Sequence, residues 1–320
     1  MQEFELIGRI FRQAAYAQAG GAVEQSIGDD CALIRVPDGH QLCVSTDSVL
    51  AGVHFPWPCD PFLLGQRALA VAVSDLAACG AEPLAFTLAL SLPQPDIAWL
   101  EALSRGLANM ATQCGIRLAG GDTTAGPLNI GITVMGSVPA GQALLRSTAR
   151  AGELLYVSGP LGAAAAALPL FADNPPSLAD DVSRSLLQAF WQPQPQLALG
   201  LWLRGRAGAA IDISDGLLAD ASHIATESAV QLQIEQAKVP VSVAARQADP
   251  QRAVQRALSG GDDYQLLFSL PQAHAVELEQ QFPLARCIGR VTVGQGVRLL
   301  DEQGHELTVD QRGYQHFQTG

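Results

Sequence analysis

Apolar and polar residues follow one another along the chain in short blocks whose spacing predicts both helices and strands. Residues 3–19 carry apolar side chains at helical intervals and end before two glycines, which predicts an amphipathic opening helix. The patterns at 61–79 and 97–114 predict longer helices, and the first has Pro at its start and Gly just past its end. The apolar runs 84–92 and 128–138 predict buried strands.

Shorter segments extend the same alternation to the rest of the chain. Residues 31–36 and 41–45 are strand-like and flank Pro37-Asp38-Gly39, a turn signal, which predicts a β-hairpin. Further strands are expected at 116–119, 154–158, 230–234, 264–270 and 286–293, and further helices after Gly162 and at 185–191, 196–204 and 216–228. Since strands and helices alternate, the predicted fold class is α/β or α+β.

A stretch rich in Pro, Gly and small residues, 139–152, lies between two well-patterned halves of the chain. A length of 320 residues favours about two domains. We therefore expect an N-terminal domain of residues 1–138 and a C-terminal domain of residues 139–320.

The composition is that of a globular protein, with 48% hydrophobic residues. No apolar run reaches the roughly 18 residues that a membrane helix needs, and the N-terminal segment is acidic where a signal peptide is basic. The six cysteines are spread singly, with no C-x-x-C pair, as is usual for buried residues in a reducing compartment. These features predict a cytoplasmic protein with no membrane partner.

The charge balance restricts the possible partners. There are 31 acidic and 19 basic residues, for a net charge of −12, so nucleic acid is not an expected partner. Lys238 is the only lysine, and its surroundings match neither a P-loop nor the strand lysine of protein kinases. If the protein binds nucleotide phosphates, metal ions must therefore supply most of the positive charge.

Aspartates recur beside Gly, Ser or Thr where predicted strands end. Mg²⁺ prefers six oxygen ligands and is usually held by one or two carboxylates together with substrate phosphates. Ser45 and Thr46 are possible auxiliary oxygen ligands. The alternative is that the aspartates are only turn residues and helix caps. The candidate carboxylates are Asp30, Asp47, Asp75, Asp122, Asp212 and Asp215.

The chain lacks the common signatures of nucleophilic and zinc-dependent catalysis. There is no G-x-S-x-G and no H-E-x-x-H segment, and no two histidines stand at metal-ligand spacing. His54 is the histidine of interest, because it lies in a Pro- and aromatic-rich loop a few residues after Asp47. A loop histidine without a function is the alternative.

Taken together, the motifs resemble those of the thiamine-monophosphate kinase family, in the superfamily of aminoimidazole ribonucleotide synthetase and selenophosphate synthetase. The resemblance covers nearly the whole chain. It rests on Gly28-Asp29-Asp30, Ser45-Thr46-Asp47, Val73-Ser74-Asp75, Gly120-Gly121-Asp122, Leu145-Arg146-Ser147, the segment Asp212 to Gly216 and the segment Gly260 to Tyr264.

The resemblance implies a two-domain fold and a homodimer whose N-terminal domains pair through their strands, with ATP and several Mg²⁺ ions in a cleft between the domains. The implied Mg²⁺ ligands are Asp30, Ser45, Thr46, Asp47, Asp75, Asp122, Asp212 and Asp215. The implied ATP contacts are Gly121, Asp122, Arg146 and Ser214, and the implied thiamine monophosphate contacts are His54, Asp262 and Tyr314. Ser104 stands where some members carry a tyrosine near the nucleotide.

The implied reaction agrees with the residues present. A phosphate monoester acceptor is largely dianionic near neutral pH, since its second pKa is about 6, so it needs no general base. We therefore expect ATP- and Mg²⁺-dependent transfer of a phosphoryl group to thiamine monophosphate, which gives thiamine diphosphate. The alternatives are another ATP-dependent reaction of the superfamily, a metal-dependent phosphohydrolase, and a divalent-cation binder without enzymatic activity.

Overall fold

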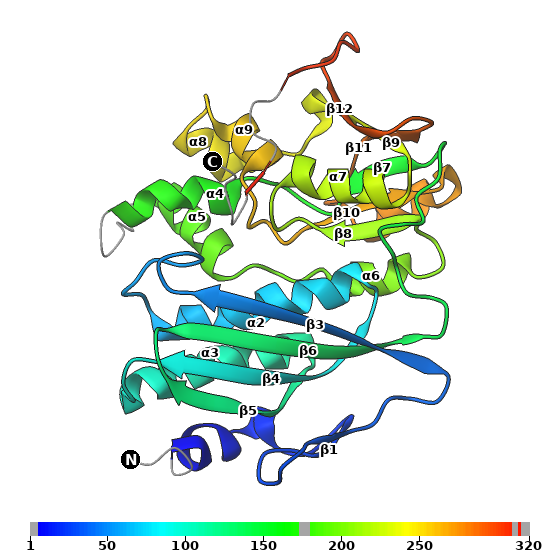
Figure 1. Cartoon of the computed structure of the whole chain (residues 1–320). Helices are drawn as coiled ribbons and strands as arrows, with labels where there is room; N and C mark the ends of the chain where they lie inside the picture. The colour runs from blue at the N-terminus through cyan, green and yellow to red at the C-terminus, as the bar shows by residue number, and fades with distance from the viewer. Residues whose placement is uncertain (1–5, 173–179, 309–312, 315–320) are drawn as a thin grey trace. The chain divides into compact units, whose positions relative to one another are not determined.

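The computed structural model describes residues 6–172, 180–308 and 313–314. The chain divides into two compact units, the first formed by residues 1–76 and 81–141 and the second by residues 77–80 and 142–320 (Figure 1). Both units contain helices and strands, which confirms the predicted mixed α/β class. Among the described helices, none combines the length and apolar character that spanning a bilayer requires.

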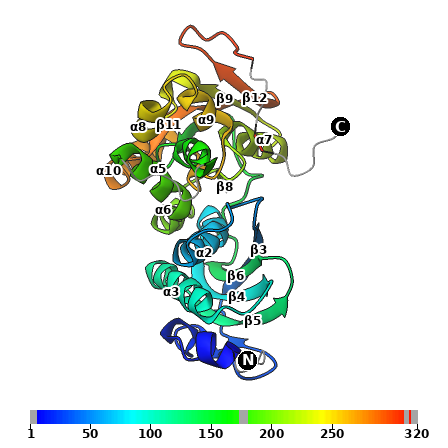
Figure 2. The ribbon, with the colours of Figure 1, turned by 90° about the vertical axis from the view of Figure 1, so that its left-hand side faces the viewer.

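The first unit is built on a four-stranded sheet with the order β3-β6-β4-β5. β4 and β5 are parallel, and the other neighbouring strands are antiparallel. Helices α2 and α3 lie on one face of this sheet (Figure 2). The bounds are β3 His40–Leu50, β6 Asn129–Pro139, β4 Glu82–Leu92, β5 Arg117–Ala125, α2 Pro61–Ala78 and α3 Ile97–Cys114.

The helices of this unit have clear start and stop signals. Asp96 caps α3 by accepting a hydrogen bond from the Trp99 N–H at 3.2 Å, and Gly115 ends it with a left-handed φ of 65°. Pro61 opens α2, and its fixed φ suits a first helical position. The sequence prediction is confirmed for both helices.

The two faces of the first sheet are covered differently. Alternate residues of β4, including Phe86, Leu88 and Leu90, are buried on the helix-covered face. On the other face, the short strands β1 (Val23–Gln25) and β2 (Leu33–Ile34) cover part of the sheet around Ala85 and Met135.

The predicted hairpin between residues 31–36 and 41–45 is wrong. β2 pairs with β1 in a separate two-stranded sheet, and β3 pairs with β6 over its full 11 residues. The long ladder with β6 satisfies many more backbone hydrogen bonds than pairing with the two-residue β2 would.

The opening helix is also less regular than predicted. Residues 1–5 lie outside the described part of the chain; beyond them, a π-helical turn covers Gly8–Arg12 and a 3₁₀ turn covers Ala15–Ala17. Ala14 between them has an extended conformation. The break turns Tyr16 into the core, where its ring stacks on Phe86 with centroids 6.3 Å apart.

The second unit contains a six-stranded sheet with the order β12-β9-β11-β7-β10-β8. Only β12 and β9 are parallel among its neighbouring pairs. The strands are β7 Leu154–Val157, β8 Ala209–Asp212, β9 Gln231–Glu235, β10 Leu266–Leu270, β11 Arg286–Thr292 and β12 Gly296–Leu300. The α-helices are α4 Ala163–Ala167, α5 Asp181–Trp191, α6 Leu197–Leu203, α7 Leu217–Glu227, α8 Val243–Ala248, α9 Ala253–Ser259 and α10 Ala275–Gln281.

Apolar side chains cover both faces of this second sheet. α7 and α9 contribute to the core on one face, and α6 and α10 contribute to the core on the other. Every residue of β10 is therefore buried, and the strand reads as a continuous apolar run. The sequence analysis missed β12 and the helices α8, α9 and α10.

Candidate active site

Three predicted ligands meet on the helix-covered face of the first unit, and we call Ser45, Asp47 and Asp75 the β3–α2 group. Ser45 and Asp47 alternate along β3 and so share one face, while Asp75 lies on α2. The Ser45 hydroxyl donates a hydrogen bond to Oδ2 of Asp75. Burial, together with the nearby charge of Asp75, raises the pKa of Asp47 to about 6. The group therefore holds negative charge where a cation would relieve repulsion.

The sheet register links Asp47 to the glycine pair of β5. Asp47 is opposite Ile132, Ile132 is opposite Leu88, and Leu88 is opposite Gly121. A side chain cannot replace the hydrogen of Gly121, because a Cβ there would lie 2.0 Å from the Leu88 carbonyl oxygen. Gly121 thus permits the close approach of β5 to β4.

Two other predicted ligands belong to the opposite face of the same sheet. Thr46 follows Ser45 along β3, and Asp122 follows Gly121 along β5. Because side chains alternate along a strand, Thr46 and Asp122 point to the face opposite the β3–α2 group. Both are exposed, and the Thr46 hydroxyl lies 2.8 Å from the Thr133 hydroxyl. Within a single copy of this unit, the structure does not bring Thr46 and Asp122 into the β3–α2 group.

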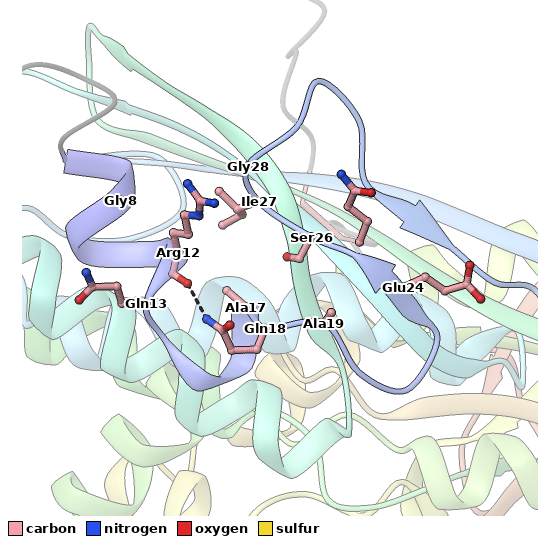
Figure 3. A pocket seen from close by; sticks show the side chains of 11 residues that line it. Gly8, Arg12, Gln13, Ala17, Gln18, Ala19, Glu24, Ser26, Ile27 and Gly28 are labelled. Carbon is pink, nitrogen blue, oxygen red and sulfur yellow. Dashed lines mark hydrogen bonds between the residues drawn. The ribbon is translucent and has the colours of Figure 1, made fainter.

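Asp30 lies in the loop between β1 and β2 and is exposed. Its N–H donates to Oδ1 of Asp29 at 2.9 Å, and this bond, followed by one from Gln25, lowers the pKa of Asp29. A groove of about 750 Å³ borders the loop, and the Arg12 guanidinium points toward Gly28 beside it (Figure 3). A Cβ on Gly28, whose φ is 133°, would lie 2.8 Å from Nη2 of Arg12. Gly28 therefore lets Arg12 pack directly against the aspartate loop.

His54 has a defined ring orientation. Its Nδ1 accepts a hydrogen bond from the Leu50 N–H at 3.0 Å, so the proton of the neutral ring is on Nε2. The fully buried Arg67 donates to the His54 carbonyl oxygen at 3.4 Å and ties the loop to α2. Nearby, Trp57 is 49% exposed and meets Trp99 edge-on, with centroids 6.1 Å apart.

In the second unit, three loops gather around the end of β8, and we call Asp212, Ser214, Asp215 and Asp262 the loop group. Asp212 is the last residue of β8 and is buried. The Asp262 N–H donates to the Ser214 carbonyl at 2.8 Å. The Tyr314 N–H donates to the Asp215 carbonyl at 3.0 Å, and the Tyr314 side chain is 47% exposed. The structure thus brings together the predicted ligands and contacts that belong to this unit, with the exception of Arg146.

Backbone conformation holds the loop group together. Asp262 has a φ of 62°, which is uncommon for a residue with a side chain, and its carboxylate accepts a bond from the Tyr264 hydroxyl at 3.0 Å. A Cβ on Gly261 would lie 2.4 Å from the Ser214 carbonyl oxygen. Only glycine at that position allows the loop 260–264 to pack against the loop 213–216.

The sequence analysis missed Asp220, in the first turn of α7. Its Oδ2 accepts three hydrogen bonds of 3.1 Å, from the N–H groups of Ser214, Asp215 and Gly216. Burial, and then the charges of Asp212 and Asp215, raise its pKa to about 8. An acidic residue four positions after a loop glycine was the available signal in the sequence.

Arg146 and Ser104 have hydrogen-bond partners outside the two groups. Arg146 is exposed, and its carbonyl accepts a bond of 2.7 Å from the Ser228 hydroxyl. Ser104 is buried, and its hydroxyl lies 3.0 Å from that of Tyr16 and 3.3 Å from the Ile10 carbonyl oxygen. The Ser104 hydroxyl is thus engaged by residues of the first unit.

Oxygen ligands dominate both groups, as hard cations such as Mg²⁺ require. Among the described residues, however, no three His, Cys, Asp or Glu side chains are arranged closely enough to hold a metal ion by themselves. A Mg²⁺ ion at either group would need further oxygens, and phosphate and water are its usual additional ligands.

Comparisons with known proteins define the class. Residues 28–138 match the family model "AIR synthase related protein, N-terminal domain". The chain superposes on the crystal structure of thiamine-monophosphate kinase from Stenotrophomonas maltophilia K279a with a TM-score of 0.85 and 42% identity, covering 93% of this chain and 96% of that one. The fold is therefore that of the AIR-synthase-related proteins.

The particular family follows from full-length similarity. The chain is 40% identical to thiamine-monophosphate kinase of Escherichia coli K12 over 324 aligned residues, covering 99% of this chain and 98% of that protein. It is also similar to the structure of AaThiL complexed with AMPPCP and TMP, with 30% identity, a TM-score of 0.79, and coverage of 91% of this chain and 92% of that one. The chain belongs to the thiamine-monophosphate kinase family, as the motifs predicted.

Proposed function

We propose that this protein transfers the γ-phosphoryl group of ATP to the phosphate of thiamine monophosphate, giving thiamine diphosphate and ADP. The observation that carries the proposal is the similarity to AaThiL, whose structure holds AMPPCP and TMP together. The first is an ATP analogue, and the second is the acceptor. A protein that binds both at once is suited to direct transfer between them.

The proposed phosphoryl transfer does not require a general acid or a general base from the protein. A phosphate oxygen of the acceptor is already a nucleophile near neutral pH, since the second pKa of a phosphate monoester is about 6. The main obstacle is repulsion, which amounts to about 4 kcal/mol for two unit charges 4 Å apart at an effective dielectric of 20. Charge neutralisation and positioning are therefore what the site must supply.

We infer that the site binds several Mg²⁺ ions. The donor set fits the ion, because its ligands are hard oxygens and the mutual repulsion of Asp47 and Asp75 favours a cation between them. When bound, Mg²⁺ would neutralise charge on phosphate oxygens and help to position the donor and the acceptor. The residues that would hold these ions, in separate subsets, are Asp30, Ser45, Thr46, Asp47, Asp75, Asp122, Asp212 and Asp215.

The remaining site residues would bind and orient the two substrates. In the neutral tautomer, the Nε2–H of His54 would donate to the acceptor phosphate. The exposed ring of Tyr314 and the carboxylate of Asp262 suit the flat, cationic thiazolium, and Trp57 could add a cation–π contact of roughly 0.5–2 kcal/mol. For ATP we propose contacts with Gly121, Asp122, Arg146 and Ser214.

We also propose that the protein works as a homodimer in the cytoplasm. The edge strand β3 carries the apolar side chains Leu42 and Val44, which are 48% and 58% exposed in a single copy. Apolar side chains that are exposed on the open face of a sheet favour contact with a second copy. Pairing through the open face of the first sheet would also cover Thr46. Dimer formation would therefore change the surroundings of this proposed ligand.

The test is a coupled ADP-release assay with ATP, Mg²⁺ and thiamine monophosphate, with the products separated by chromatography. ADP should form together with thiamine diphosphate, and neither should form with free thiamine or without acceptor. Phosphate release without acceptor would indicate a phosphohydrolase instead. Metal-dependent thermal stabilisation without any ADP would indicate a cation-binding protein.

A further inference from the structure

Asp220 satisfies three consecutive backbone donors of the loop group. The N–H groups of Ser214, Asp215 and Gly216 all point to its Oδ2, at 3.1 Å each. Asp220 is only 2% exposed and lies in the first turn of α7. Its N–H donates to the Gly216 carbonyl at 3.0 Å. The loop and the helix start are thus closed around one buried oxygen.

Because of these three bonds, the backbone N–H groups of residues 214–216 cannot serve as donors to a ligand. Converging N–H groups ahead of a helix commonly bind an external anion such as phosphate. Here a carboxyl oxygen of the chain occupies that position, so these three donors are already used. Ligands must instead meet the half-buried side chains of Ser214 and Asp215.

The carbonyl side of the same residues is fixed as well. The Ser214 carbonyl accepts from the Asp262 N–H at 2.8 Å, and the Asp215 carbonyl accepts from the Tyr314 N–H at 3.0 Å. Ser214 and Asp215 therefore have both backbone groups bonded, the N–H to Asp220 and the carbonyl to a neighbouring loop. Their positions are set before any ligand arrives.

We propose that Asp220 is a positioning residue for cation and nucleotide binding, which holds the backbone of Ser214 and Asp215 in place. The inference rests on the proposed function, since it assumes that the loop group binds Mg²⁺ and nucleotide. It assigns Asp220 no contact with the substrates.

The test compares two variants at this position with a matched control. Asp220→Asn keeps an oxygen that can accept the N–H bonds but adds an amide group beside it, and Asp220→Ala removes the acceptor altogether. Glu153→Gln is the control, because Glu153 is also buried in the second unit and accepts from the Arg150 N–H at 3.0 Å and the Ser269 hydroxyl at 2.7 Å. Calorimetry measures binding of Mg·AMPPCP, steady-state kinetics give kcat and both KM values, and melting temperature reports folding.

We expect Asp220→Ala to weaken Mg·AMPPCP binding by at least about tenfold and to raise the Mg²⁺ concentration for half-maximal activity. Asp220→Asn should show a smaller loss in the same direction. Glu153→Gln should lower the melting temperature but leave Mg·AMPPCP affinity unchanged. If Asp220→Ala does not fold, the Mg·AMPPCP affinity and the Mg²⁺ dependence of Asp220→Asn decide the question.

Wild-type nucleotide affinity and Mg²⁺ dependence in the Asp220 variants would overturn the inference. An equal loss of affinity in Glu153→Gln would also overturn it, since the effect would then reflect general destabilisation. If the wild type bound Mg·AMPPCP but formed no thiamine diphosphate, the proposed function would fail while the binding comparison still decided the role of Asp220.

Discussion

The two groups of acidic residues are held by different means. In the β3–α2 group, regular elements place the side chains, since Ser45 and Asp47 alternate along one strand and Asp75 projects from a helix. In the loop group, only Asp212 is placed by a strand, and backbone bonds between the loops 213–216, 260–264 and 313–314 set the rest of the geometry. The first group therefore depends on sheet register, and the second depends on glycines and on Asp220.

This difference predicts different responses to the same kind of change. Removing a carboxylate from either group should impair catalysis, because both are proposed to bind cations. A change in the backbone should loosen neighbouring strands of the sheet in the first unit. In the second unit, the loosening should be confined to the loops. The following experiments test that distinction.

The largest effect is expected from removing one carboxylate in each group. Asp75→Asn and Asp212→Asn should each lower kcat by at least about a hundredfold, because a charge that acts on the reacting phosphates is lost from a preorganised site. Melting temperatures should remain close to that of the wild type. Asp38→Asn is the control, since Asp38 lies exposed in a turn before β3. Near-normal turnover at saturating Mg²⁺ would rule out the ligand roles.

A matched pair of glycine substitutions tests how far from the substituted residue the backbone is loosened. Gly121→Ala places a Cβ 2.0 Å from the Leu88 carbonyl oxygen, and Gly261→Ala places one 2.4 Å from that of Ser214. We expect each to lower the free energy of unfolding by about 1–3 kcal/mol, as measured by urea denaturation. Hydrogen exchange should show loosening across β4 and β5 for Gly121→Ala, but only in the three loops for Gly261→Ala.

Gly120→Ala provides the control for this pair, because no atom lies within 4 Å of a Cβ at that position. It should leave both stability and exchange unchanged. If Gly261→Ala loosened the whole second sheet, the loops would not be the independent support that we describe.

The β3–α2 group should make stability depend on pH when no cation is bound. The pKa of Asp47 is about 6 in the folded state and about 3.9 in the unfolded state, so the folded state binds more protons between these values. The stability that the protonated carboxyl contributes is present below pH 4 and is lost as the pH rises through 6. The expected loss is about 1–3 kcal/mol in EDTA.

Asp47→Asn isolates this effect, since the amide does not titrate. At pH 7 in EDTA the variant should be more stable than the wild type by the same amount, and near pH 4 the two should be equal. Added Mg²⁺ should stabilise the wild type more than the variant. Parallel stability curves for the two proteins across this range would contradict the assigned environment of Asp47.

The smallest effect is expected at Ser104. Ser104→Ala removes the hydroxyl contacts with Tyr16 and the Ile10 carbonyl, which should cost about 1 kcal/mol of stability. The KM for ATP should not change, because the hydroxyl lies inside the first unit. A clear rise in that KM would instead place Ser104 in the nucleotide site.

Local patterns predicted the regular parts of this molecule well. The helices at 61–79 and 97–114 and the strand at 84–92 carry strong periodicity and clear end signals, and the structure confirms them. The hairpin prediction was wrong because the partner of β3 is β6, about 90 residues further on, and no local pattern encodes that pairing. The irregular turns near Tyr16 follow from tertiary contacts for the same reason.

For the candidate site as well, local sequence patterns predicted only part of the arrangement. The alternation of Ser45 and Asp47 places them together from sequence alone, but the approach of Asp75 depends on how α2 packs on the sheet. Asp220 was missed because its role arises from three backbone donors rather than from a recognisable motif. Such contacts become visible only when the loop conformation is known.

The most direct test of the proposed function follows the transferred group itself. ATP labelled at the γ-phosphate is incubated with Mg²⁺, with and without thiamine monophosphate, and the label is traced by chromatography. Direct transfer predicts that the label appears in thiamine diphosphate when the acceptor is present and stays in ATP when it is absent. Label that accumulates as inorganic phosphate in both reactions would contradict the account.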